Sequence, residues 1–259
     1  MTTPDCVARV VHEDAVHLAR PHPRGLVLAD GRILAEDEVT WLPPVQPGTV
    51  IALGLNYAAH AHELAAELAR PAEAEPLVFF KTAGSLAGHR ARTRRPHGVR
   101  FMHYECELAV VIGRPAWQVS AAEAMARVAG YTVANDYAVR DHLENWLRPN
   151  LRAKNRDGAT LLGPWLVPAS RVADPHALAL RTFVNGALTQ QGSTSNMLHR
   201  IPALIEFLSG FMPLVPGDVI LTGTPEGVCD VRDGDEVSCE IEGIGRLLGV
   251  VVDEPPPAS

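Results

Sequence analysis

The sequence of 259 residues has few of the features that mark membrane, secreted or nucleic-acid-binding proteins. No apolar run reaches the roughly 18 residues that a membrane-spanning helix needs, and the first eleven residues lack the pattern of a signal peptide. Its four cysteines show no C-x-x-C spacing, which favours reduced thiols over a disulfide framework. Acidic residues outnumber basic ones by 30 to 23, and the net charge of −7 disfavours nucleic acid as a partner. We therefore expect a cytoplasmic protein with no membrane or nucleic-acid partner.

Several catalytic motifs are also missing. Neither G-x-G-x-x-G nor a P-loop occurs, so nucleotide binding has no support, and the absence of G-x-S-x-G makes a serine hydrolase unlikely. The zinc-peptidase motif H-E-x-x-H begins at His62-Glu63, but Ala66 stands where its second histidine is required. A peptidase zinc site is therefore excluded at this position.

The residues that are present suit a globular protein with a large core, since 47% are hydrophobic and 20% are charged. Asp30-Gly31 between two apolar runs predicts a β-hairpin. Pro43-Pro44 and Pro47-Gly48 then interrupt the chain. We predict a small β subdomain over residues 1–46 and a catalytic domain over residues 47–259.

Strand patterns predominate in the second part, and they do not alternate regularly with helices. This pattern predicts an α+β class dominated by β-structure. The predicted strands include a buried run that ends at Gly54, a long strand over 101–113, a strand over 130–136 and several near the C-terminus. The predicted helices cover 57–70, 120–128 and 199–209, the second of them with a capping box at its start.

Acidic side chains suggest a metal site. Glu105 and Glu107 are two residues apart on a predicted strand, so their side chains leave the same face. Asp136 ends another predicted strand, and Asp141 and Asp157 compete with it as a third ligand. Three carboxylates without nearby cysteines select a hard cation such as Mg²⁺ or Mn²⁺. An exposed acidic stripe is the alternative for the first pair.

Several lysine and arginine side chains could bind an anionic substrate. Lys81 ends an apolar run, and Lys154 lies among arginines that include Arg140, Arg148, Arg152 and Arg156. Most single cations of this kind lie on the surface, as we expect for the basic run 90–95, which we interpret as a solvated loop. Thr224 follows an apolar strand in a Gly/Pro turn, where a hydroxyl and backbone N–H groups can hold a carboxylate. A plain tight turn explains it equally well.

The predicted helix over 57–70 carries a possible base. His60 and Glu63 are three residues apart and share a face, so they can hydrogen-bond as a base and its orienting carboxylate. His62 points about 200° away from His60. A solvated alanine-rich helix is the alternative.

Taken in order, these segments resemble a known family. The blocks are "GLNYAAHAHE", "VFFK", "YECELAVVIG", "GYTVANDYAVRD", "LRAKNRDG", "VNGALTQQGSTSNM", "PGDVILTGTPEGV" and "GDEVSCEIEGIG". Over residues 48 to 252 the chain is similar to the fumarylacetoacetate hydrolase superfamily. The run from Asn135 to Gly158 resembles in particular the branch that degrades homoprotocatechuate and 4-hydroxyphenylacetate.

The resemblance implies a mixed β-sandwich roll with flanking helices, usually a homodimer, and a set of site residues. It implies that Glu105, Glu107 and Asp136 bind Mg²⁺ or Mn²⁺. It also implies a catalytic role for His60, Glu63 and Lys154. Lys81 and Thr224 match substrate-binding positions, and we add Arg140 to this group.

The implied activity is decarboxylation or double-bond isomerisation of a small anionic 2-oxo (2-hydroxy-dienoate) acid through a metal-stabilised enolate. Acylpyruvate or fumarylpyruvate hydrolysis and oxaloacetate decarboxylation are the alternatives within the superfamily. Leu143 stands where acylpyruvate hydrolases carry a glutamine, which disfavours the first of these alternatives.

Overall fold

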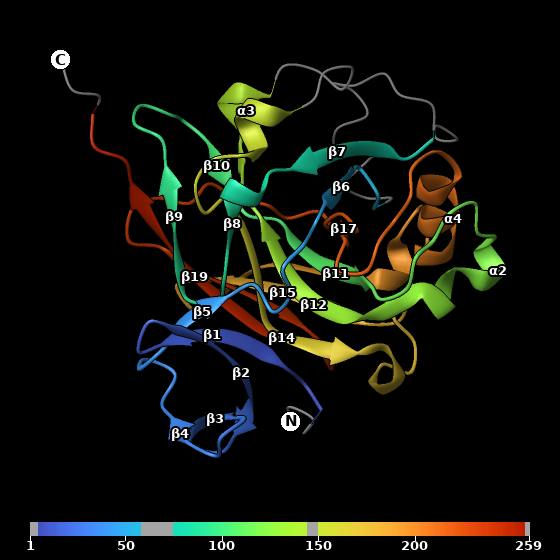
Figure 1. Ribbon diagram of the computed structural model, residues 1–259. Helices are drawn as coiled ribbons and strands as arrows, with labels where there is room; N and C mark the ends of the chain where they lie inside the picture. Colours follow the sequence, from blue (N-terminus) through green and yellow to red (C-terminus); the bar gives the residue numbers. More distant parts are fainter. Residues whose placement is uncertain (1–4, 58–74, 144–149, 257–259) are drawn as a thin grey trace.

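The computed structural model describes residues 5–57, 75–143 and 150–256, and strands predominate in these ranges. They form a curled sheet, a second sheet packed on it, and a small N-terminal sheet, with short helices at the edges (Figure 1). The predicted class, α+β dominated by β-structure, is confirmed.

The N-terminal strands form a five-stranded antiparallel sheet at one end of the molecule (Figure 1). They are β1 (Ala8–His12), β2 (Ala15–His22), β3 (Gly25–Leu28), β4 (Ile33–Leu34) and β5 (Thr40–Leu42), in the order β4-β3-β2-β1-β5. The hairpin predicted at Asp30-Gly31 joins β3 to β4, and Gly31 takes a φ of +88° there. Ala8 and Val10 face the hydrophobic core that the rest of the chain shares. A domain boundary near residue 46 stays a prediction.

A seven-stranded mixed sheet carries most of the predicted site. Its strands are β6 (Val50–Gly54), β7 (Leu77–Lys81), β8 (Leu86–Ala87), β11 (Cys106–Ile112), β12 (Val128–Asp136), β14 (Thr160–Pro168) and β17 (Val219–Leu221). Their order is β7-β6-β17-β11-β12-β14-β8, with β17–β6 and β14–β8 parallel.

This sheet must curl, because its two edge strands are neighbours in the sequence. Six gaps between flat strands would separate β7 from β8 by about 29 Å. The linker of residues 82–85, which contains η1 (Ala83–Ser85), can span only about 17 Å. The curl encloses a small apolar cluster on one face that includes Phe79, Ala109 and Leu162.

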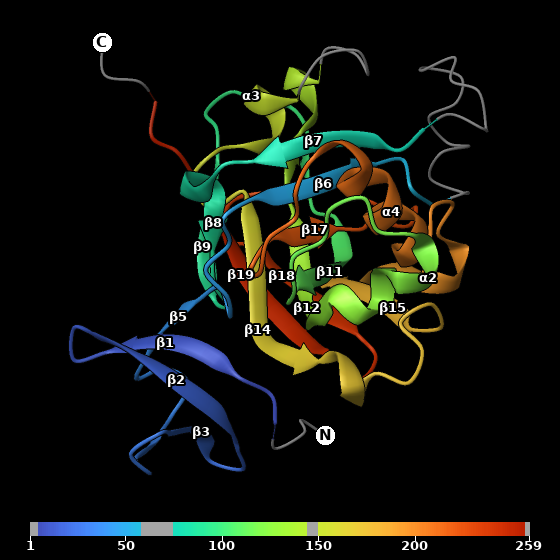
Figure 2. The ribbon, with the colours of Figure 1, turned by 45° about the vertical axis from the view of Figure 1, so that its right-hand side comes forward.

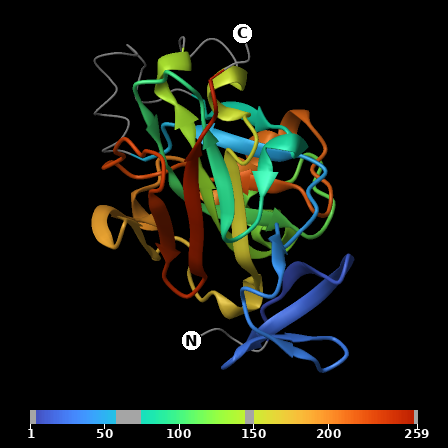
Figure 3. The same cartoon turned by 90° about the vertical axis from the view of Figure 1, so that its left-hand side faces the viewer.

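The opposite face of the curled sheet packs on a five-stranded sheet. The strands of this second sheet are β9 (Ala91–Arg95), β15 (Ala179–Val184), β16 (Ala187–Ser193), β18 (Glu236–Ile241) and β19 (Gly245–Asp253), in the order β16-β15-β18-β19-β9. Figure 3 brings the C-terminal strands of this sheet to the front. Leu108 from one sheet and Val237 and Leu247 from the other belong to the main core.

Short helices and a two-stranded ribbon complete the described parts. The helix predicted near 199–209 is confirmed as α4 (Ile201–Phe211), whose Leu204 and Leu208 are buried in the core. It contacts α2 (Ala121–Ala124), as Figure 2 shows. The others are α3 (Leu151–Lys154) and the 3₁₀ turns η2 (Met125–Arg127), η3 (Arg140–His142), η4 (Ala169–Arg171) and η5 (Thr194–Asn196), while β10 (Met102–His103) and β13 (Ala138–Val139) form the ribbon.

Three local predictions differ from the structure. The strand predicted over 101–113 is two strands, because β10 pairs with β13 whereas β11 pairs with β12. The helix predicted to reach residue 128 ends earlier, since Val128 already pairs with Ile112 in the sheet. The basic run 90–95, predicted as a solvated loop, contains β9, which pairs with β19. The helix predicted over 57–70 lies outside the described residues, apart from its first position.

No helix in the described ranges is long and apolar enough to cross a membrane.

Candidate metal centre

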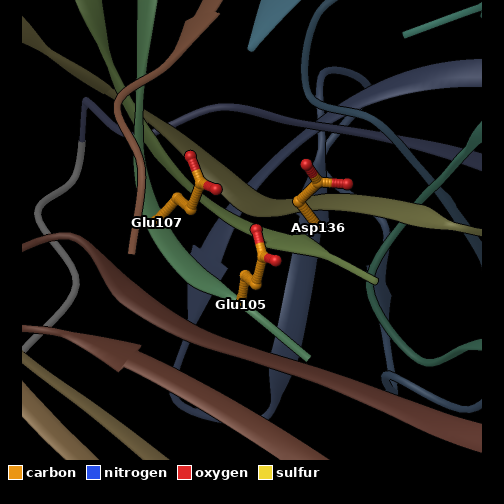
Figure 4. A group of neighbouring side chains, drawn as sticks. All are labelled: Glu105, Glu107 and Asp136. Carbon is orange, nitrogen blue, oxygen red and sulfur yellow. The ribbon is translucent and has the colours of Figure 1, made fainter. Parts of the chain in front are cut away.

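Three carboxylates meet at one end of the β11–β12 pair. Glu107 lies in β11, Glu105 comes directly before that strand, and Asp136 is the last residue of β12. One oxygen from each lies within 4.8 Å of the others. Figure 4 shows the three side chains gathered on one side of the strand pair. The sequence predicted this convergence, because strand periodicity places Glu107 on the same face as Ala109, which belongs to the cluster inside the curl.

The two competing aspartates lie elsewhere. Asp141 accepts hydrogen bonds from the backbone N–H groups of Arg100 and Phe101, at 3.1 and 3.0 Å. Asp157 pairs with Arg94 at 3.1 Å near the surface. Asp136 is thus the third carboxylate of the cluster.

Two buried lysines from different elements contact this cluster. Lys154, at the end of α3, donates to Glu105 Oε2 at 2.6 Å and to Asp136 Oδ2 at 3.1 Å. Lys81, at the end of β7, donates to Asp136 Oδ1 at 2.5 Å and to the backbone carbonyl of Lys154. Both predicted lysines therefore contact the predicted metal ligands.

Their different surroundings shift the pKa values of the two lysines in opposite directions. Burial lowers the pKa of Lys81, and the attraction of Asp136 offsets this effect only in part. Burial also opposes the charge of Lys154, but Asp136 and Glu105 outweigh it and raise the pKa of that lysine. Lys154 is therefore the more firmly charged of the pair.

The charge of Glu107 is poorly compensated by its surroundings. Glu107 Oε2 accepts a hydrogen bond from Gly223 N at 2.6 Å, whereas its Oε1 has no partner among the described residues. Burial, with Asp136 and Glu105 nearby, raises the pKa of Glu107 well above its ordinary value. With every group ionised, three carboxylates and two lysines leave a net charge of −1. A divalent cation fits this oxygen-only donor set and its orphaned oxygen.

Sequence reasoning missed His103, which precedes the cluster and is buried. Its Nδ1 lies 3.2 Å from Tyr104 O and 3.6 Å from Glu105 Oε1. Both neighbours are acceptors, which places the proton of the neutral ring on Nδ1. Burial lowers the pKa of His103 to about 4, although Glu105 opposes this shift. The sequence around His103 gave no signal for this position, because Phe101 and Met102 precede it and Tyr104 follows it.

Thr224 occupies the turn after β17, and its hydroxyl is fully engaged. The hydroxyl donates to Cys106 O at 2.9 Å and accepts from Gln190 Nε2 at 2.9 Å. It therefore has no second proton for a substrate carboxylate. Gln190 also donates to Pro225 O and accepts from Thr182, which connects the turn to the second sheet. The substrate-binding role of Thr224 stays a prediction.

The remaining predicted residues are only partly placed. Arg140 opens η3 and is half-buried, and its charge contributes to the lowered pKa of His103. His60, Glu63 and Arg148 lie outside the described residues. The structure thus brings together the three carboxylates and two lysines, with Thr224 linked to the backbone between two of the ligands.

Comparisons with known proteins show which family the chain resembles. The family model described as the C-terminal part of fumarylacetoacetate (FAA) hydrolase matches residues 49–252. A 4-hydroxyphenylacetate degradation bifunctional isomerase/decarboxylase from Salmonella dublin is 54% identical over 237 residues, which are 89% of this chain and 54% of the relative. The chain thus spans about half the length of this relative.

Two further proteins are similar over most of both chains. A mitochondrial oxaloacetate tautomerase from Homo sapiens is 41% identical over 233 residues, which are 85% of this chain and 72% of the relative. The crystal structure of a 5-carboxymethyl-2-hydroxymuconate delta-isomerase from Mycobacterium smegmatis superposes with a TM-score of 0.83 and 39% identity. That superposition covers 97% of this chain and all of the other.

Proposed function

Because the chain belongs to the fumarylacetoacetate hydrolase family, we propose that it is a divalent-metal-dependent enzyme that decarboxylates or isomerises a 2-oxo di- or tricarboxylic acid. The source of that acid would be 4-hydroxyphenylacetate catabolism, in which the Salmonella dublin relative is named. The observation that carries the proposal is the cluster of three carboxylates, with Glu107 and Asp136 buried, around a Glu107 oxygen that has no partner among the described residues.

The chain's residues would prepare the site for an anionic substrate. A bound Mg²⁺ or Mn²⁺ supplies Lewis-acid stabilisation of negative charge on the substrate's oxygen. Glu105, Glu107 and Asp136 would hold that cation, while Lys154 limits the repulsion between Glu105 and Asp136. A divalent charge changes the net charge of the cluster from −1 to +1. The cluster then attracts the 2-oxo acid's adjacent carboxylate.

Proton transfer is assigned to the residues of the predicted helix. In decarboxylation the bond to a carboxylate carbon breaks, its electron pair moves into the conjugated 2-oxo system, and CO₂ leaves. His60, oriented by Glu63, would then deliver a proton to carbon. In isomerisation His60 would remove a proton from one carbon and return it at another. Arg140 and Lys81 would neutralise the substrate's other carboxylates.

Oxaloacetate keto–enol tautomerisation is a second candidate. It is favoured by the human relative of that name, because this chain covers 72% of that protein. The same cluster would serve it, since tautomerisation also moves a proton next to an oxygen that gains charge. The two candidates differ in their substrates, and only decarboxylation, within the first candidate, breaks a carbon–carbon bond.

An assay of separate substrates with Mg²⁺ tests the proposal. We expect CO₂ release from 5-oxopent-3-ene-1,2,5-tricarboxylate or a shifted double bond in 2-hydroxyhepta-2,4-diene-1,7-dioate, each followed by proton NMR. Loss of the enol absorbance of oxaloacetate without CO₂ would select the second candidate. Hydrolytic cleavage of fumarylpyruvate into two acids, with neither of the other reactions, would contradict both.

We also propose that the chain forms a homodimer and acts in the cytoplasm. The family resemblance supports the first, and the second is supported by the four cysteines, all in the described ranges, which form no disulfide. Light scattering during gel filtration would measure the mass, for which we expect twice the 27.9 kDa of one chain. A monomer at micromolar concentration would contradict the dimer.

A further inference from the structure

The helix that carries Lys154 is too short to hold this side chain by itself. α3 has only four residues, and one helical turn has no independent stability in water. The position of the Lys154 ammonium therefore depends on contacts made by the residues beside it. Residues that follow Lys154 make several such contacts. Arg156 forms an ion pair with Glu254, and Gly158 O accepts a hydrogen bond from Thr93 Oγ1. These two contacts hold the loop after α3, and neither involves a residue of the carboxylate cluster.

Asn155 contacts the backbone on both sides of Lys81, and Lys81 itself contacts the cluster. Asn155 Oδ1 accepts a hydrogen bond from Thr82 N at 2.5 Å, and its Nδ2 donates to Phe80 O at 3.2 Å. Phe80 and Thr82 are the two neighbours of Lys81, on the edge strand β7 and directly after it. One side-chain amide thus holds the backbone on both sides of Lys81.

The side chain of Lys81 makes the reverse contact, from β7 to the segment that contains Asn155. Its ammonium donates to the carbonyl of Lys154, the residue before Asn155, and to Asp136 Oδ1. The Asn155 amide and the Lys81 ammonium therefore link the same two segments reciprocally. Lys81 is thus held by the backbone of Lys154, and the residue after Lys154 is held by the backbone on both sides of Lys81.

We propose that Asn155 is a positioning residue that fixes Lys81 against Asp136 and thereby keeps Asp136 oriented for a divalent cation. The functional meaning of this role rests on the proposed metal-dependent activity. The clamp itself, by which we mean the two hydrogen bonds of the Asn155 amide to Thr82 N and Phe80 O, does not depend on that activity. Residues that orient metal ligands in this way typically change metal affinity by about 10- to 100-fold when they are replaced.

The chemistry of the contact explains why an amide is required. The edge of β7 offers one donor, Thr82 N, and one acceptor, Phe80 O, so the clamp needs one acceptor and one donor in a fixed plane. Aspartate provides only acceptors and would repel Phe80 O. Alanine provides neither group.

Isothermal titration with MgCl₂ tests the proposal on the purified full chain. We expect Asn155→Ala to weaken Mg²⁺ binding about tenfold, and Asn155→Asp to weaken it as well. Asn185→Ala is a matched control, because the Asn185 amide also makes two hydrogen bonds, to Asp235 and Glu236, in an exposed turn. We expect the control to bind Mg²⁺ like the wild type.

A double substitution separates positioning from a general loss of structure. In a Lys81→Met background the clamp has no ammonium to position, so adding Asn155→Ala should change Mg²⁺ affinity less than twofold. An equal loss in both backgrounds, or no loss in the wild-type background, would overturn the proposal. If Asn155→Ala fails to fold, the same comparison with Asn155→Asp decides. This readout needs no substrate, so it stays informative if the proposed reaction proves wrong.

Discussion

The side chain of Glu107 is fully buried, and only one of its carboxylate oxygens has a hydrogen-bond partner among the described residues. Burial of an ionised group without full compensation costs free energy, and here two more carboxylates add repulsion. Without a cation, this residue destabilises the fold. A bound divalent cation removes both penalties.

Glu107→Gln should therefore separate stability from metal binding. We expect the metal-free variant to be at least as stable as the wild type, because a neutral amide replaces a buried carboxylate whose charge is not fully compensated. At a Mg²⁺ concentration of about 100 times Kd, the wild type should gain about 2.7 kcal/mol and the variant almost nothing. Urea unfolding with and without Mg²⁺ measures both effects. A variant that keeps the full Mg²⁺ stabilisation would remove Glu107 from the site.

His89 provides a residue-scale prediction on pH. Its ring is buried against Trp41, and its Nδ1 accepts a hydrogen bond from Leu248 N at 3.1 Å. Burial, together with Arg90 and Arg246, lowers the pKa of His89 from 6.5 to about 3. The folded state thus keeps the ring neutral where the unfolded state is already protonated. Its contribution to stability is complete above pH 6.5 and is lost as the pH falls toward 3.

His89→Asn tests this linkage, because the amide oxygen of asparagine can still accept from Leu248 N. Between pH 6.5 and 5 the wild type should lose about 2 kcal/mol of unfolding free energy through this group, and the variant should not. The other histidines are unchanged and contribute equally to both proteins. Urea titrations at pH 7 and pH 5 would measure the difference. Equal losses would show that His89 is protonated in the folded protein.

At the scale of elements, the N-terminal sheet is joined to the main body through β5. Trp41 of β5 contacts the rings of Trp165 and His89 edge-on, at centroid distances of 5.4 and 4.8 Å. The chain comes so close here that a Cβ on Gly88 would lie 2.2 Å from Trp41 O. Glycine at position 88 is therefore required by this contact.

Trp41→Ala should destabilise the whole protein by about 3–5 kcal/mol, because it empties a buried site between the two parts. Trp117→Ala is the matched control, since Trp117 is 52% exposed and should change stability by less than about 0.5 kcal/mol. Thermal unfolding would compare them. A Trp41→Ala protein as stable as the control would show that the N-terminal sheet folds without support from the body.

Strand and helix predictions succeeded where the local pattern was decisive. β6 ends at Gly54 and α4 covers nearly the predicted range, because an apolar run and a helical period each determine one element. The run 101–113 reads as one continuous strand, yet it is divided between two sheets by its partners, β13 and β12. Local periodicity does not identify a strand's partner, so this division could not be predicted.

The site shows the same limit. Strand spacing alone predicted that Glu105 and Glu107 share a face, whereas Asp136 was distinguished from Asp141 and Asp157 only by the family resemblance. Asn155 and Gln190 could not be predicted, because their contacts join residues more than thirty positions apart. His103 also has an ordinary sequence context, and only the ribbon of β10 and β13 buries it beside Glu105.

For the whole molecule, the curl of the seven-stranded sheet is what makes the site. It brings Lys81, at an edge strand, to the carboxylates of the central strands β11 and β12. α3 adds Lys154 from the loop between β13 and β14. Residues from four separate segments thus form the cluster of carboxylates and lysines. The central claim is that this cluster carries a metal-dependent reaction.

The most direct test is the rate of substrate turnover with saturating Mg²⁺ in the wild type, in Glu107→Gln and in the control Glu236→Gln, whose side chain is exposed on β18. We predict that Glu107→Gln loses at least about a thousandfold in kcat/KM, since it removes a metal ligand, and that the control keeps the wild-type rate. The wild type should also lose its activity in EDTA and regain it with Mg²⁺. Wild-type rates in Glu107→Gln, or full activity in EDTA, would contradict the account.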